Sequence, residues 1–273
     1  MKTIVHLSDL HFGRVDKTRI KPIMKAIDKI KPDLIIISGD LTQRATEKEY
    51  AEAKAFIDKL YYPVFVIPGN HDIPLYNVFR RMISPYKKYF KFISSNLSPV
   101  YTDKEIAVIG INTVRRSTIS SGRISKKQIK ETTKILEEID PEKIKIIVCH
   151  HPFDLPTRSH HAHTHKVVAR AKTAMNHLSQ QKVDMFLAGH LHLSHAGDTT
   201  SRYKIKDYSG LIIQAGTAIS KRSRGEPVSF NVLKINKPEI VVEHYSGDPV
   251  SKKFLLSSSR IFKSNANGWQ ENI

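Results

Sequence analysis

The sequence is short of cysteine, of long apolar runs and of acidic residues. One cysteine, Cys149, stands among 273 residues, so an intramolecular disulfide is excluded and a reducing compartment fits. No apolar run approaches the roughly 20 residues of a membrane-spanning helix. The opening residues run straight into a predicted strand, with no apolar segment followed by a small-residue cleavage site, so we expect no signal peptide. These absences predict a cytoplasmic protein.

Basic residues greatly outnumber acidic ones. The chain has 44 Lys and Arg against 26 Asp and Glu, which gives a net charge of +18. A solvated, lysine-rich surface is the ordinary explanation, but a charge of this size also concentrates anionic substrates, nucleic acid or acidic lipid. A peripheral position on the inner membrane face therefore stays open beside a purely cytoplasmic one. The sequence does not indicate an oligomeric state.

The first quarter of the chain alternates apolar runs with amphipathic stretches. Residues 2–8, 34–38 and 64–67 are predicted strands, and residues 18–30 and 46–60 are predicted helices with apolar side chains at helical spacing. Continuous apolar runs are typical of strands buried on both faces. The pattern predicts an α/β fold with two βαβ units, a parallel sheet and right-handed crossovers.

The rest of the chain continues this alternation with shorter elements. Residues 75–98 are basic and aromatic, and predict an irregular helical excursion. Further elements are predicted at residues 100–112 (two short strands), 125–139 (helix), 143–149 (strand), 169–178 (helix) and 183–188 (strand). An antiparallel second sheet is predicted from short runs at residues 205–208, 211–215, 229–235 and 240–245. We expect one domain over residues 1–256 and a polar, poorly ordered tail over residues 257–273.

Side chains that bind metals follow five of the predicted strands. They are Asp9 and His11, Asp40, Asn70 and His71, His150 and His151, and His190 and His192. Loops at the carboxyl ends of parallel strands share one edge of an α/β sheet, so residues far apart in sequence converge there. A lone Asp-x-His or His-x-His pair is more often incidental than functional. Five such clusters in order at strand ends favour a metal site.

The same residues resemble the five sequence blocks of the calcineurin-like metallophosphoesterase superfamily. The blocks are Asp9-Leu10-His11, Gly39-Asp40, Gly69-Asn70-His71-Asp72, His150 and Gly189-His190-Leu191-His192. They span about two thirds of the chain, and the chain looks most similar to the class III cyclic-nucleotide phosphodiesterase group. The resemblance implies a four-layer α/β/β/α sandwich of two mixed sheets flanked by helices, with the metal site at the strand carboxyl ends.

The resemblance also implies a role for each residue. Two metals would be held by Asp9, His11 and His192 on one side, by Asn70, His150 and His190 on the other, and by Asp40 between them. His71 would stay off the metals and act as general acid for the leaving alkoxide, with Asp72 orienting it. His151, next to the ligand His150, would be structural or lie behind the ligands.

The chemistry of this donor set points to phosphodiester hydrolysis. Mixed imidazole and carboxylate ligands suit Mn, Fe, Zn, Co or Ni better than Ca or Mg. Two dications with Asp9 and Asp40 leave a formal charge of +2, which suits a phosphodiester monoanion and a hydroxide. Metals about 3.5 to 4 Å apart lower the pKa of a bridging water. We expect a phosphodiesterase that uses a metal-bridging hydroxide as nucleophile. Its substrate would be a small phosphodiester or nucleotide, and a cyclic nucleotide is the first candidate.

Several basic residues are weaker candidates for substrate contact. They are Arg14, Arg115, His151, His161 and His163. A solvated loop explains the histidine-dense segment 160–165 equally well, and a surface salt bridge explains Arg14 nearly as well. The resemblance also places the loop 216–220, followed by Arg222 and Arg224, near the metals.

Two other hydrolase functions stay open. The basic excess would suit a peripheral-membrane pyrophosphatase of a nucleotide-linked lipid precursor, together with the aromatic residues Phe79, Tyr86, Tyr89, Phe90 and Phe92. The basic loops would also suit a nuclease of the same superfamily, although no capping domain or dimerisation segment is evident. A non-catalytic scaffold is disfavoured, because every ligand position and His71 are present.

Overall fold

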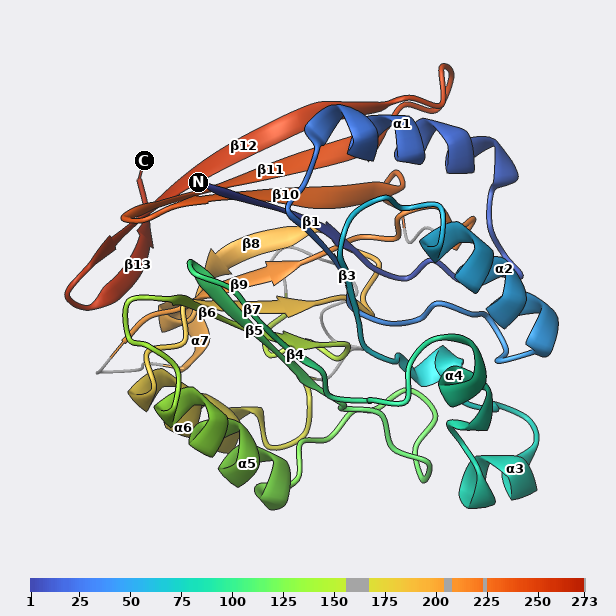
Figure 1. Cartoon of the computed structure of the whole chain (residues 1–273), viewed down its shortest axis with the longest axis horizontal. Helices are drawn as coiled ribbons and strands as arrows, with labels where there is room; N and C mark the ends of the chain where they lie inside the picture. Colours follow the sequence, from blue (N-terminus) through green and yellow to red (C-terminus); the bar gives the residue numbers. More distant parts are fainter. Residues whose placement is uncertain (156–166, 204–207, 223–224, 273) are drawn as a thin grey trace.

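Two β-sheets lie face to face, and helices cover their outer faces (Figure 1). The structure is a computed structural model that describes residues 1–155, 167–203, 208–222 and 225–272. Both sheets are mixed, with parallel and antiparallel pairs. The arrangement confirms the expected four-layer α/β/β/α sandwich of two mixed sheets.

The first sheet has the strand order β13-β12-β11-β10-β1-β2-β3. Its strands are β1 (Lys2–Leu7), β2 (Leu34–Ile37), β3 (Val64–Val66), β10 (Ser229–Asn236), β11 (Glu239–Gly247), β12 (Phe254–Asn265) and β13 (Gly268–Glu271). Strands β1, β2 and β3 run parallel, as βαβ units require. The other four strands extend the sheet in antiparallel pairs beside β1.

The second sheet has the strand order β4-β5-β6-β7-β9-β8. Its strands are β4 (Val100–Thr102), β5 (Ile106–Ile111), β6 (Ile144–Cys149), β7 (Met185–Ala188), β8 (His195–Asp198) and β9 (Leu211–Gln214). Four central strands are parallel, and β4 and β8 form antiparallel edges.

The helices connect the strands on the outer faces. They are α1 (Ile20–Ile30), α2 (Glu47–Ile57), α3 (Val78–Ile83), α4 (Lys87–Phe92), α5 (Lys126–Glu137), α6 (Ala171–Gln180) and α7 (Thr200–Tyr203), with 3₁₀ turns η1 (Lys17–Arg19) and η2 (Asn70–Asp72). A capping box of Thr46 and Glu49 starts α2, and one of Ser125 and Gln128 starts α5. Among the described residues, no helix is both long and apolar enough to cross a membrane.

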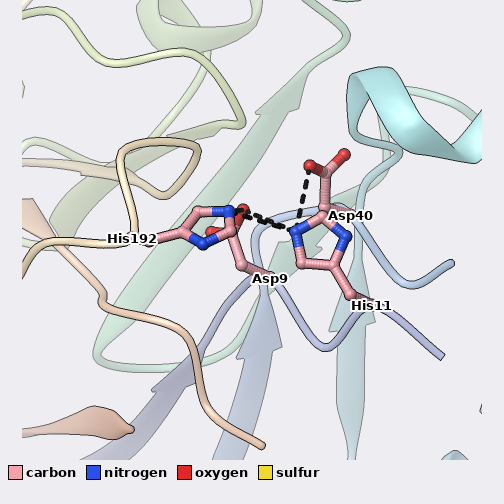
Figure 2. A group of neighbouring side chains, drawn as sticks. All are labelled: Asp9, His11, Asp40 and His192. Atoms are coloured by element: carbon pink, nitrogen blue, oxygen red, sulfur yellow. Dashed lines mark hydrogen bonds and ion pairs between the residues drawn. The ribbon is translucent and has the colours of Figure 1, made fainter. Parts of the chain in front are cut away.

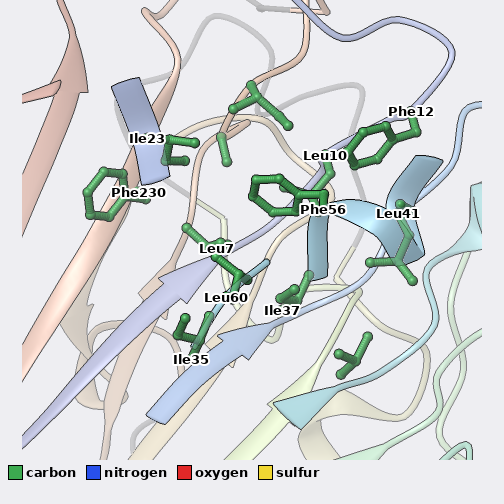
Figure 3. Packing of buried hydrophobic residues seen from close by; sticks show 14 of the residues in the cluster. Leu7, Leu10, Phe12, Ile23, Ile35, Ile37, Leu41, Phe56, Leu60 and Phe230 are labelled. Carbon is green, nitrogen blue, oxygen red and sulfur yellow. The ribbon is translucent and has the colours of Figure 1, made fainter. Parts of the chain in front are cut away.

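Apolar side chains fill three layers between the four layers of backbone. Alternation along β2 sends Ile35 and Ile37 into the layer under α1 and α2, and Leu34 and Ile36 into the layer between the sheets. Figure 3 shows Ile35 and Ile37 in the first of these layers with Phe56 of α2. Burial on both faces explains why this strand is a continuous apolar run.

The carboxyl ends of the parallel strands in the two sheets meet at one edge of the sandwich. Asp9, after β1, is hydrogen-bonded through its backbone N–H to the carbonyl oxygen of Gly39, after β2. Across the sheets, His150 Nδ1, after β6, lies 2.8 Å from the carbonyl oxygen of Ser38. The loops expected to carry metal ligands therefore lie together.

The predicted antiparallel second sheet is wrong in its composition. Strand β9 pairs in parallel with β7, whereas β10 and β11 join the first sheet beside β1. The period-two pattern of a strand shows which face is buried but does not identify the neighbouring strand. Residues 205–207 of the predicted strand 205–208 lie outside the described residues.

The expectation of a poorly ordered tail beyond residue 256 is also wrong. Strand β12 pairs with β11 and then with β13. Trp269 of β13 is fully buried, and its Nε1 donates a hydrogen bond to Asp184 at 2.8 Å. Most side chains of β12 are exposed, so its sequence lacks the apolar alternation of a half-buried strand. The first sheet therefore continues past the predicted boundary at residue 256.

Candidate metal centre

Five of the predicted ligands have a left-handed backbone conformation. The φ values of Asp9, His11, Asp40, His190 and His192 are 53°, 47°, 53°, 72° and 60°. For residues other than glycine, such conformations cost roughly 1–3 kcal/mol each and persist where the surrounding structure enforces them. They arise here because the chain turns sharply after β1, β2 and β7. Strain concentrated in this way is a common property of functional sites.

The first donor group consists of Asp9, His11, Asp40 and His192, whose candidate ligand atoms lie within 4.8 Å of one another (Figure 2). His11 Nε2 lies 3.1 Å from His192 Nε2 and 3.6 Å from an oxygen of each carboxylate. His192 Nε2 lies 3.2 Å from Asp9 Oδ1. His192 Nδ1 donates to the carbonyl oxygen of Arg222 at 2.5 Å, which leaves Nε2 as the lone-pair nitrogen of the neutral ring.

The second donor group consists of Asp40, His150 and His190, with the amide oxygen of Asn70 between them. His150 Nε2 lies 3.3 Å from Asp40 Oδ1 and 3.0 Å from Asn70 Oδ1. His190 Nδ1 lies 3.1 Å from the same amide oxygen. Asp40 belongs to both groups, because its Oδ2 faces His11 and its Oδ1 faces His150.

These separations fit donor atoms arranged around divalent cations. Ligand bonds of about 2.1 Å place neighbouring donors roughly 3.0–3.4 Å apart in octahedral or tetrahedral coordination. Asp9 Oδ1 is buried and accepts no hydrogen bond from any described residue. The lone-pair nitrogen of His192 also faces His11 Nε2 at close range. The two donor groups therefore fit two divalent metal ions that share Asp40.

The electrostatics of both groups favour cations. Burial opposes the charge of Asp9, but the neighbouring histidines His192, His11 and His150 together outweigh it and hold the pKa of Asp9 well below its usual range. Burial also opposes a charge on His150, yet the adjacent Asp40 raises the pKa of His150 to about 9. Burial, with His150 nearby, lowers the pKa of His190 to about 3. Buried carboxylates among these imidazoles form a pair of sites that metal ions can occupy in place of protons.

Two glycines allow the loops to approach closely enough. A Cβ on Gly69 would overlap the backbone nitrogen and the carboxylate of Asp40, and a Cβ on Gly189 would overlap Ser8 and Asp9. No larger residue fits at either position without moving a carboxylate of the site.

His71 lies beside the donor groups, and neither group of described residues includes it. Its backbone N–H donates to Asp40 Oδ1 at 2.8 Å, and its ring meets that of His11 edge-on with 4.9 Å between centroids. Its Nδ1 lies 2.8 Å from the carbonyl oxygen of Gln43. Since a carbonyl only accepts, Nδ1 carries a hydrogen. Nε2 lies 3.0 Å from Arg222 Nη1 and accepts from it when the ring is neutral.

Asp72 does not orient His71, so the predicted pairing of these side chains is wrong. The Asp72 carboxylate instead accepts, at 2.8–3.1 Å, from the backbone N–H groups of Leu41, Thr42 and Gly69 and from the hydroxyl of Thr42. Burial and the charge of Asp40 raise the pKa of Asp72 to about 7. Asp72 joins the turns after β2 and β3, and the Gln43 carbonyl orients the imidazole of His71.

His151 is buried behind the second donor group. Its Nδ1 lies 2.8 Å from the hydroxyl of Thr113, and its ring centroid lies 4.6 Å from that of His190 and 5.0 Å from that of His150. Burial holds its pKa well below the usual range. The side chain therefore packs against the ligand rings of His150 and His190.

Neither the side chain of Arg115 nor that of Arg14 forms a hydrogen bond with a described residue of the donor groups. The Arg115 guanidinium donates to the carbonyl oxygens of Asn112 and Val114 and to Gln128 Oε1, so it braces the loop before α5. Arg14 is exposed, and its side chain makes no hydrogen bond or ion pair with another described residue.

Some predicted residues lie outside the description, and two contributions to the site were not predicted. His161, His163 and Arg224 fall outside the described residues. The carbonyl of Gln43 was missed because a backbone group has no signature in the sequence. Arg222 was considered only as part of a loop near the metals, and nothing in its neighbours indicates a contact with His71.

Comparison with known proteins agrees with this geometry. Residues 2–194 match the family described as calcineurin-like phosphoesterase. The chain is 34% identical over 125 residues to a probable glycerophosphodiester phosphodiesterase, GpdQ, of Arcobacter nitrofigilis, covering 45% of this chain and 43% of the relative. It is 28% identical over 157 residues to a probable cyclic nucleotide phosphodiesterase of Ruthia magnifica, covering 55% and 61%. Each match spans less than two thirds of the relative's own length.

Among solved structures, the purple acid phosphatase PPD1 of yellow lupin (Lupinus luteus) superposes with a TM-score of 0.70 at 13% identity, over 95% of this chain and 53% of that chain. At this identity the likeness shows the fold alone. The family match covers more than two thirds of the chain and includes every residue of both donor groups. The chain therefore belongs to the calcineurin-like phosphoesterase family.

Proposed function

We propose that the chain is a two-metal phosphodiesterase that hydrolyses a small phosphodiester. The observation that carries this proposal is the position of Asp40, whose two oxygens face the two donor groups separately. Next to Asp40, His71 presents Nε2 towards Arg222. A carboxylate shared by two metal sites, with an imidazole beside it, has the parts that two-metal phosphoester hydrolysis needs.

Mn, Fe, Zn, Co or Ni are the proposed occupants, because imidazole nitrogens dominate the donor set. Bound as a pair, such ions supply Lewis acidity and a source of hydroxide near neutral pH. Asp9 and Asp40 are the charged members of the set. The neutral oxygen of Asn70 therefore preserves a formal surplus of +2 for an anionic substrate.

His71 is the proposed general acid. The leaving alkoxide needs a proton, and Nε2 is the ring nitrogen that can gain and donate one, because the hydrogen on Nδ1 is held by Gln43. The same hydrogen bond keeps the ring orientation constant while Nε2 changes its protonation state. His71 can therefore act without binding a metal.

Arg222 is proposed to hold a phosphate oxygen. Its guanidinium is a permanent donor, so it cannot remain bonded to Nε2 of His71 once that nitrogen is protonated. An anionic phosphodiester oxygen would accept from both cations at this point. Because the backbone carbonyl of Arg222 also accepts from His192, the same residue supports a metal ligand.

A cyclic nucleotide is the first candidate substrate, and a glycerophosphodiester is the second. The relatives described above are named for these two activities. Both substrates are monoanionic phosphodiesters of small size, which the charge of the site suits. They differ in the groups around the phosphate, so the surrounding loops would decide between them.

A substrate screen tests the proposal. Protein loaded with Mn²⁺ is assayed on cyclic nucleotides, glycerophosphodiesters, a nucleotide-linked lipid pyrophosphate and single-stranded DNA, with Asp40→Ala as the control. We expect the highest kcat/KM on a small phosphodiester. A preference for the lipid pyrophosphate would instead favour a membrane pyrophosphatase, and a preference for DNA would favour a nuclease. Activity no greater than that of the control on every substrate would overturn the enzyme proposal.

A further inference from the structure

Helix α3 has the reverse polarity of an ordinary surface helix. Val78, Phe79, Met82 and Ile83 are 68%, 74%, 42% and 65% exposed, and their spacing places them on one helix face. Tyr76, just before the helix, is 77% exposed. These five residues are called the α3 surface below. Several exposed apolar side chains on one helix face are typical of an interaction site.

A buried arginine holds α3 in this orientation. Arg81 is on the opposite side of the helix and is 4% exposed. Its guanidinium donates to the carbonyl oxygens of Pro74, Arg115, Arg116 and Thr118. Asn77 caps the helix, because its side-chain oxygen accepts from the backbone N–H of Arg80 at 2.8 Å. Polar contacts therefore fix the helix with its apolar side chains outward.

Exposed basic residues lie next to the α3 surface. Residues 73–102 contain five Lys and Arg and no Asp or Glu. Arg80 and Lys87 are exposed. Arg116 is also exposed, and its Nη1 donates to the backbone carbonyl of Met82 at 3.0 Å. The patch thus combines exposed apolar side chains with a positive rim.

We propose that the α3 surface docks onto an anionic lipid surface, with its apolar side chains in the headgroup boundary and the positive rim against acidic headgroups. Helix α3 lies at an outer corner of the molecule (Figure 1), where it can meet a flat surface. A second copy of the chain is a poorer occupant, since a two-fold contact would bring the positive rims of both copies together.

The aromatic residues expected from the sequence to face a membrane divide into two sets. Tyr89 is fully buried, and Tyr86 and Phe92 pack partly buried against the core. Phe79 and Phe90 are exposed. The α3 surface also contains Val78, Met82 and Ile83, which an aromatic pattern does not reveal.

Docking through α3 would hold the metal centre near the lipid. Val78 is six positions after Asp72, so at most about 20 Å of chain joins the turn that carries His71 to the helix. A phosphodiester in or near the headgroup layer would then be within reach. This consequence rests on the proposed function, whereas docking itself does not and is measured without turnover.

Vesicle co-sedimentation tests the proposal. Wild-type protein is mixed with vesicles of phosphatidylcholine alone, or of phosphatidylcholine with phosphatidylglycerol, at low and high salt. We expect binding to the mixed vesicles that weakens at high salt, and binding at least about tenfold weaker for the triple variant Val78→Ser, Phe79→Ser, Ile83→Ser. The matched control, Tyr61→Ser with Val250→Ser, changes residues that are 87% and 88% exposed elsewhere and should bind like wild type.

A second variant and two further measurements complete the test. Arg80→Glu with Lys87→Glu keeps the apolar face and should remove the salt-sensitive part of vesicle binding. The triple variant should keep the wild-type melting temperature and its rate on a water-soluble substrate. The proposal is overturned if wild-type protein binds neither vesicle type, or if the triple variant binds as well as wild type. It is also overturned if sedimentation velocity shows a wild-type dimer that the triple variant converts to a monomer.

Discussion

Two buried carboxylate clusters lie at opposite ends of the same sandwich. Asp184 precedes β7, and its oxygens accept from the backbone N–H of Lys145, the hydroxyl of Tyr208 and Nε1 of Trp269 at 2.7–2.8 Å. At the other end, Asp9 follows β1, and its Oδ1 accepts no hydrogen bond from any described residue. Both carboxylates are buried, so burial alone does not distinguish a structural group from a binding site.

The difference lies in how completely each carboxylate is satisfied. Neutral donors surround Asp184, and one of them, Trp269, comes from the opposite sheet, so this cluster joins layers of the fold. Asp9 faces His192, whose lone-pair nitrogen also points into the group. Buried polar atoms normally find partners, and a carboxylate oxygen that lacks one beside further ligand atoms fits a site for a cation.

The largest effect is expected from Asp40→Asn, which removes the charge shared by both donor groups and keeps the shape of the side chain. Loss of several kcal/mol of transition-state stabilisation should lower kcat/KM by about 10³-fold or more. Elemental analysis should show fewer than two metals per chain. Asp184→Asn is the matched control and should keep both metals. A variant at Asp40 with two metals and the wild-type rate would contradict the account.

His71→Gln should lower kcat by about 10²–10⁴-fold on an alkyl phosphodiester, because the leaving alkoxide loses its proton donor. Metal content should stay at the wild-type level. An aryl leaving group needs little protonation, so the loss on an aryl phosphodiester should be much smaller. Equal losses on both substrates would remove His71 from the role of general acid.

Removal of the metals by a chelator should lower the thermal stability of the protein. Metal at about 100 times its dissociation constant adds about 2.7 kcal/mol to the free energy of unfolding, and this increment should disappear in chelator. Differential scanning calorimetry measures it. Asp184→Asn should show the same metal-dependent increment as wild type, since its cluster binds no metal in this account. An unchanged melting temperature of wild type in chelator would count against two metal sites.

Arg222→Met should lower kcat/KM by about 10–100-fold, because it removes a charged hydrogen bond to the substrate. Arg222→Lys keeps the positive charge but lacks the planar guanidinium group, so its kcat/KM should lie between those of wild type and Arg222→Met. Metal content should not change, since the backbone carbonyl at this position still accepts from His192. Full activity of Arg222→Met would show that the contact with His71 has no part in substrate binding.

The smallest effect is expected from Asp184→Asn, where one side-chain amide group would face the backbone N–H of Lys145. The mismatch should lower the free energy of unfolding by about 1–3 kcal/mol, as measured by urea denaturation. The kcat/KM on the best substrate should remain that of wild type. A loss of activity larger than the loss of folded protein would break the contrast between the two clusters.

Patterns that depend on local spacing predicted most of the fold and the positions of the donor residues. Asp9, Asp40 and His150 each follow an apolar run, and strand ends of a parallel sheet converge whatever the intervening loops contain. The order of strands in the sheets was harder to predict, because β1, which pairs with β10, is far from it in sequence.

Side-chain partners were the least predictable feature. Asp72 is next to His71 in sequence, but its carboxylate accepts from backbone N–H groups of two turns. The backbone carbonyl of Gln43 accepts from His71 instead. Arg115 likewise braces its own loop. Such choices depend on where nearby donors lie in space, and the sequence does not show this.

The most direct test of the central claim is anomalous diffraction from crystals grown with Mn²⁺. The account predicts two peaks, one bound by Asp9, His11 and His192 and the other by Asn70, His150 and His190, with Asp40 bound to both. His71 should contact neither metal. A single peak, a peak bound by His71, or an Asn70 side chain turned away from the metals would contradict it.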